Sequence, residues 1–147
     1  MDKDERIVVV TADIGYGILD AMREKYPSRV INVGSAETLM VGVAIGLSYS
    51  DMIPICYSIT PFLIYRPFEM LRNYVDHEKV PIKLVGSGRD KDYAHDGFTH
   101  WSHDDLQVLG CFPNIKVYKP DDEDFTPTLV EEFVYTDGPC YLNLRRS

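Results

Sequence analysis

Six short, nearly continuous apolar runs divide the chain, at residues 6–11, 30–33, 53–59, 82–85, 115–118 and 140–144. Segments that read as helices separate them, at 18–25, 37–49, 67–77, 104–109 and 122–135. Strands that are apolar on both faces and alternate with helices form buried parallel sheets joined by right-handed crossovers. We therefore predict one α/β domain over residues 1–147, with a parallel six-stranded sheet and helices on both faces.

Composition limits the class of protein. The chain has 147 residues, of which 45% are hydrophobic, so it can bury a substantial core. No apolar run approaches the roughly 20 residues that span a membrane, and the net charge of −8 argues against nucleic-acid binding. The first six residues are too charged for a signal peptide, and the three scattered cysteines suit a reducing compartment. These features predict a cytoplasmic protein.

Five segments follow strands of the predicted sheet. In open parallel sheets, ligands bind outside the carboxyl ends of the strands. The segments expected there are 13–17, 34–37, 60–66, 86–100 and 145–146. These loops form the predicted functional surface.

Glu37 is the single acidic residue between positions 31 and 48. It follows a strand, and Ser35 is placed to cap the helix that Glu37 begins. In one reading Glu37 faces solvent, where an acid in the first turn favours the helix dipole. In the other it is buried, and a buried carboxylate needs a partner because an unpaired charge costs several kcal/mol or more.

The polar segment 86–103 is rich in histidine and aspartate: His95, His100, His103, Asp90, Asp92 and Asp96. A metal site is one reading of this segment. The histidine spacing is not a standard ligand pattern, however, and a solvated acidic loop explains most of it.

Taken in order, these segments resemble the pyrimidine-binding domain of the transketolase family of thiamine diphosphate enzymes. The resemblance covers the whole chain and rests on residues 29–37 (RVINVGSAE), 61–72 (PFLIYRPFEMLR), 94–100 (AHDGFTH) and 112–121 (FPNIKVYKPD). It implies the thiamine diphosphate-binding fold and the transfer of a two-carbon ketol unit between sugars or sugar-like substrates.

The resemblance also implies roles for residues at the cofactor. Glu37 matches the glutamate that hydrogen-bonds the pyrimidine ring and promotes loss of the thiazolium proton. Phe62 and Tyr65 match aromatic residues that pack on this ring, although both could instead fill the core. Ile14 matches an apolar residue beside the cofactor. Asp13 is a further candidate, for which a turn role is an equally good reading.

Substrate contacts are implied at Asp96 and His100, and His100 could donate a proton near neutral pH. Of the residues that bind the substrate phosphate in the family, Arg146 is the one remaining candidate. The chain departs from the family at several positions near these residues: Gly17, Thr38, Leu39, Gly88, Phe98 and Trp101. The reaction class is therefore expected to be retained, while an ordinary sugar-phosphate substrate is not.

The 147 residues contain no Gly-Asp-Gly…Asn motif for magnesium and diphosphate, and nothing like the family's C-terminal domain. The resemblance thus implies one subunit of a split transketolase, whose diphosphate-binding partner carries the Mg²⁺ ligands. Gly34, Gly42 and Gly46 predict a close packing partner, either within the chain or in another chain, and self-association around a dimer axis is expected. The alternatives are a subunit of a 2-oxoacid decarboxylase or acyloin synthase, and a non-catalytic assembly or regulatory subunit.

Overall fold

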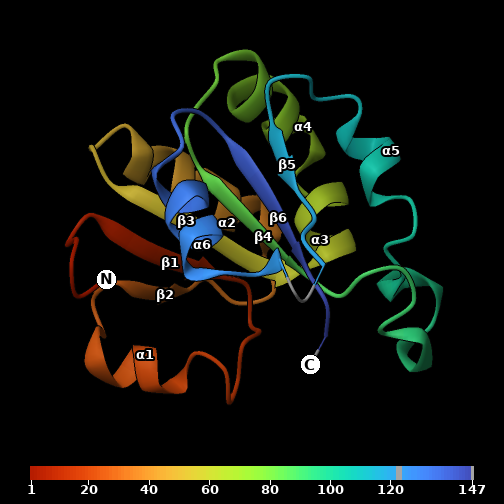
Figure 1. The fold of residues 1–147 in the computed structure, drawn as a ribbon, viewed down its shortest axis with the longest axis horizontal. Helices are drawn as coiled ribbons and strands as arrows, with labels where there is room; N and C mark the ends of the chain where they lie inside the picture. The colour runs from red at the N-terminus through yellow and green to blue at the C-terminus, as the bar shows by residue number, and fades with distance from the viewer. Residues whose placement is uncertain (122–123, 147) are drawn as a thin grey trace.

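A computed structural model describes residues 1–121 and 124–146 and shows a parallel sheet at the centre of the molecule (Figure 1). Its strand order is β2-β1-β3-β4-β6-β5, and every neighbouring pair is parallel. The strands are β1 (Ile7–Thr11), β2 (Val30–Asn32), β3 (Ile53–Ile59), β4 (Lys83–Ser87), β5 (Lys116–Tyr118) and β6 (Cys140–Leu144). The predicted six-stranded parallel sheet is confirmed.

Helices cover both faces of this sheet, as predicted (Figure 1). One face packs against α2 (Glu37–Ser48), α3 (Thr60–Tyr65), α4 (Phe68–Met70), the π-helix η1 (Leu71–His77) and α5 (Asp105–Leu109). The other face packs against α1 (Asp20–Lys25) and α6 (Pro127–Tyr135). Side chains alternate along a strand, so Val8 and Val10 pack on the face covered by α2, while Val9 packs on the opposite face, beside α1.

The segment after β3 differs from the prediction. Residues 60–66 are not a loop, because α3 starts directly at Thr60, and Pro61 is compatible with a first helical turn. The predicted helix 67–77 is divided into α4 and the π-helix η1. Leu63 and Ile64 are fully buried, so core packing stabilises this short helix.

Helix starts also differ in detail. Ala36 is the N-cap of α2, and Ser35 makes no capping hydrogen bond, so the predicted cap is wrong. The last helix begins at Pro127, where the Thr126 hydroxyl accepts a hydrogen bond from Leu129 N at 3.2 Å. The predicted start at 122 lies outside the described residues. No helix in the described part of the chain is long and apolar enough to cross a membrane.

Candidate functional site

Glu37 is buried at the start of α2, with 3% of its surface exposed. Both carboxylate oxygens accept hydrogen bonds from Arg66 Nη1, at 2.8 and 2.7 Å. The Thr38 hydroxyl donates to the Arg66 carbonyl at 3.1 Å, which ties the first turn of α2 to the end of α3. The solvent-facing reading of Glu37 is therefore wrong, and the buried charge is paired.

Phe62 lies on the same face of α3 as Arg66, because residues four apart are neighbours on a helix. The Arg66 guanidinium carbon lies 3.8 Å from the Phe62 ring centroid, a cation–π arrangement. Glu37, Arg66 and Phe62 thus form one layered group at the carboxyl end of the sheet.

His100 joins this group from the loop after β4. Its ring meets the Phe62 ring edge-on, with centroids 4.9 Å apart, and its Nδ1 lies 3.0 Å from the Thr99 hydroxyl. Tyr65, on the same helix as Phe62, is partly exposed. Partial burial raises the pKa of Tyr65, and the nearby Asp104 carboxylate raises it further.

A second polar group joins an earlier part of the same loop to Arg146. Arg146 Nη1 lies 3.1 Å from His95 Nε2, which in turn lies 3.2 Å from Asp96 Oδ2. The Tyr93 ring connects the two groups, since its centroid is 4.8 Å from the Arg146 guanidinium carbon and 6.4 Å from the His100 ring. Asp96, His100 and Arg146, predicted as substrate residues, therefore lie along one surface.

Asp13 and Ile14 stand apart from these groups. Asp13 has a positive φ of 53° and its backbone N–H donates to Asn32 Oδ1, which is the geometry of a turn. The hydrogen bond from the Tyr16 hydroxyl holds the pKa of Asp13 below its ordinary value. Among the described side chains, no hydrogen bond or ring contact joins either residue to Glu37 or Phe62. The turn reading explains Asp13.

A pocket of about 320 Å³ adjoins Phe62. It lies between α3 and the segment 98–104, and it is lined by Phe62, Tyr65, Arg66, Phe98, Trp101 and Asp104, with Pro61, Thr99 and His103. The two bulky departures from the family, Phe98 and Trp101, therefore shape this pocket. In the described ranges, no group of three or more His, Cys, Asp or Glu side chains could hold a metal ion. His103 packs instead near the Phe98 and Trp101 rings.

Buried polar side chains anchor the loops that carry the site. The Thr60 hydroxyl contacts the carbonyls of Ser87 and Gly88, at 3.2 and 2.9 Å, which joins the start of α3 to the base of the 88–103 loop. Arg89, almost fully buried, donates to the Asn143 side chain and carbonyl, each at 2.7 Å. These contacts hold α3, β6 and the loop in one arrangement.

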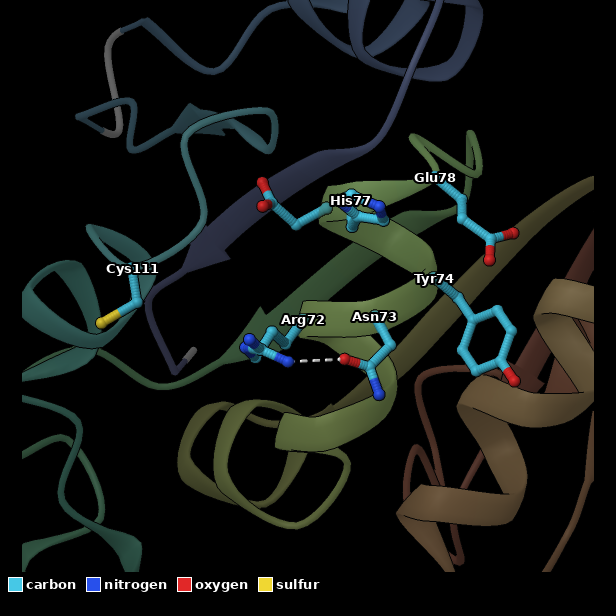
Figure 2. Close-up of a pocket in the computed structure, with 7 residues that line it drawn as sticks. Arg72, Asn73, Tyr74, His77, Glu78 and Cys111 are labelled. Atoms are coloured by element: carbon cyan, nitrogen blue, oxygen red, sulfur yellow. Dashed lines mark hydrogen bonds between the residues drawn. The ribbon is translucent and has the colours of Figure 1, made fainter.

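A separate pocket of about 440 Å³ lies along the π-helix, away from the predicted site residues. Figure 2 shows Arg72, Asn73, Tyr74 and His77 on this helix, with Cys111 across from it. None of the residues predicted for cofactor or substrate binding lines it, so it is not the candidate site.

Sequence reasoning missed Arg66 and Tyr93. The Phe62–Arg66 spacing of four would have indicated a shared face if residues 60–65 had been recognised as helical. Tyr93 carried no comparable signal, because its role depends on loop residues that meet only in the folded chain.

Comparison with known proteins supports the assignment of the fold. The family model of the transketolase pyrimidine binding domain matches residues 1–147. A 33.6 kDa protein of the fasciation locus of Rhodococcoides fascians is 36% identical, over 98% of this chain and 46% of that protein. The 6-deoxy-6-sulfo-D-fructose transketolase subunit SqwH of a Clostridium strain is 32% identical, over 98% of this chain and 45% of that protein.

A solved structure of a split-gene transketolase, described as an inactive beta4 tetramer, is also similar. It superposes with a TM-score of 0.84 at 30% identity, over 99% of this chain and 47% of that one. The present chain thus spans about half the length of each of these three relatives. The match over the full length, together with the fold, shows that the chain belongs to the transketolase pyrimidine-binding domain family.

Proposed function

We propose that this chain supplies the pyrimidine-binding half of a thiamine diphosphate site in a two-subunit, transketolase-like enzyme. The observation that carries the proposal is the buried Glu37 carboxylate and the Phe62 ring, which both contact the Arg66 guanidinium. A carboxylate acceptor next to an aromatic surface fits an aminopyrimidine, which is planar and presents ring nitrogen and amino groups. The relatives named as transketolase subunits support the same reaction, transfer of a two-carbon ketol unit between sugars or sugar-like substrates.

Each residue of the group has a distinct task in this proposal. Glu37 would hydrogen-bond the pyrimidine nitrogen of a bound cofactor, and its burial would exclude competing water. Phe62 provides the stacking surface, and Tyr65, Ile14 and Asp13 remain predicted cofactor contacts. When bound, the cofactor supplies the carbanion-stabilising chemistry.

Substrate binding is assigned to the loop after β4 and to the end of the chain. Asp96 and His100 hydrogen-bond sugar hydroxyl and carbonyl groups, and His100 donates a proton. The edge-on contact of His100 with Phe62 supports this role, because it places the imidazole beside the proposed cofactor surface. Arg146 offers a cation to an anionic end of the substrate.

The remaining parts of the site are assigned to partner molecules. A diphosphate-binding subunit provides the Mg²⁺ ligands and the anchor for the diphosphate. Self-association is supported by the outer side of α2, where Leu39 is 54% exposed and a Cβ on Gly46 would meet no atom within 4 Å. Gly42, by contrast, faces Met70 of the same chain.

The test is cofactor binding by the assembled pair. This chain is purified with a diphosphate-binding transketolase subunit, and thiamine diphosphate is titrated into the pair and into the partner alone by calorimetry. Glu37→Gln should leave assembly intact and lower turnover by at least about 100-fold, the lower range for general acid–base groups. Glu24→Gln on the exposed side of α1 is the matched control. A pair that binds the cofactor no better than the partner alone would refute the proposal.

A further inference from the structure

The Arg66 side chain contacts both groups that are proposed to bind the pyrimidine, the Glu37 carboxylate and the Phe62 ring. Its guanidinium bonds the Glu37 carboxylate through Nη1 and lies 3.8 Å from the centroid of the Phe62 ring. A guanidinium resembles an aminopyrimidine in the relevant respects, since both are planar and both present N–H donors. The two groups therefore compete for the same acceptor and the same aromatic surface.

We propose that Arg66 is an internal occupant of the pyrimidine site, which keeps the free subunit closed and must swing out before the cofactor binds. The inference rests on the proposed function and adds a gating residue to it. It explains how the chain keeps a carboxylate buried before the cofactor arrives: among the described residues, Arg66 is the one cation paired with Glu37. Without that pairing, the buried charge would be costly.

The surroundings of Arg66 allow this movement. Its side chain is 46% exposed, while that of Glu37 is 3% exposed, so the arginine rather than the glutamate can leave. The hydrogen bond from Thr38 holds the Arg66 carbonyl, which keeps the end of α3 fixed while the side chain rotates. The adjoining pocket of about 320 Å³ provides the space, and Asp104 on its wall offers the displaced guanidinium another carboxylate.

Removing the occupant should tighten cofactor binding. In calorimetric titrations of thiamine diphosphate into the assembled pair, we expect Arg66→Gln to lower the Kd about tenfold, the equivalent of one charge-assisted hydrogen bond. Arg66→Lys keeps the charge but loses the planar stack, so its Kd should fall between those of the wild type and Arg66→Gln. Arg72→Gln removes an exposed arginine whose one hydrogen-bond partner among the described residues is Asn73, and it should leave the Kd unchanged.

A second readout needs no cofactor. In the free chain, ¹⁵N NMR should show slower hydrogen exchange for the Arg66 guanidinium than for that of Arg72, and Glu37→Gln should remove this protection. Arg66→Lys retains a cation beside Glu37, so it keeps the affinity comparison available if Arg66→Gln does not fold.

The outcomes separate the two proposals. If cofactor binding depends on Glu37 but Arg66→Gln leaves the Kd unchanged or raises it, Arg66 is not an occupant and the inference is overturned. If Arg66 is unprotected in the free chain, the inference is overturned as well. If the pair binds no cofactor while the Arg66 protection depends on Glu37, the proposed function fails and the closed state of the subunit stands.

Discussion

Asp105 is a buried carboxylate that joins α5 to β6. Its Oδ2 accepts hydrogen bonds from the Tyr141 hydroxyl at 3.2 Å and from Asn143 Nδ2 at 3.0 Å. Its Oδ1 accepts from the backbone N–H of Leu106 at 2.7 Å, and Lys119 Nζ lies 3.9 Å away. Asp105→Ala removes all of these acceptors from a site where the carboxylate is 2% exposed.

The stability lost in Asp105→Ala comes from the hydrogen-bond donors that no longer have an acceptor. Burial raises the pKa of Tyr141, so its hydroxyl stays protonated and needs an acceptor. Asn143 Nδ2 keeps the Tyr141 oxygen at 2.8 Å, so it is not fully orphaned. Two donors, the Tyr141 hydroxyl and Leu106 N–H, then lose their partner at about 1–3 kcal/mol each. Relief from burying the Asp105 charge offsets part of this, which leaves a loss of about 3 kcal/mol.

Urea unfolding of the isolated chain measures this loss. With a typical slope of about 2 kcal/mol per M, 3 kcal/mol moves the midpoint down by about 1.5 M at unchanged slope. Asp105→Asn keeps one acceptor and should lose about half as much, while Glu24→Ala on the surface should stay within about 0.5 kcal/mol of the wild type. A loss below about 1 kcal/mol for Asp105→Ala would show that the network does not stabilise the fold.

Two glycines give opposite predictions in the same unfolding assay. In Gly86→Ala the new Cβ would lie 2.6 Å from Thr60 Oγ1 and 2.9 Å from Tyr141 Oη, so we expect a loss of about 2–3 kcal/mol from overpacking; a neutral result would contradict the close packing of β4. In Gly46→Ala the new Cβ meets nothing within 4 Å in an exposed helical turn, so we expect a gain of up to about 1 kcal/mol. If Gly46→Ala also weakens self-association in sedimentation experiments, α2 is the contact surface; unchanged assembly would place the contact elsewhere.

The sheet was predictable from sequence because its strands are almost continuously apolar. The bounds of β3, Ile53–Ile59, agree with the prediction. Helix α3 was not predictable in the same way. Residues 60–65 are too few to show a helical period, and their bulky apolar side chains also suit a strand or a buried loop. Residues 60–65 form a helix because Leu63 and Ile64 pack into the core.

Some features of the candidate site were likewise predictable from the sequence, and others were not. The position of Glu37 after a strand was enough to place it at the ligand-binding edge of a parallel sheet. Its partner was not foreseeable, because Arg66 follows 29 residues later and meets Glu37 only where the start of α2 and the end of α3 come together. The arrangement of Tyr93, His95 and Arg146 likewise joins a loop to the chain end, 51 residues apart for His95 and Arg146.

The anchoring of the 88–103 loop at its base has a consequence for how this protein can change over evolution. Thr60 and Ser102 both donate to the Gly88 carbonyl, so the base is fixed to α3 and the two ends of the loop are held together. The tip is mostly exposed to solvent, and Phe98 there is 72% exposed. Mutations at the tip can therefore accumulate at little cost to stability. The surface proposed to bind substrate can change in this way while Glu37 and Phe62 keep their geometry.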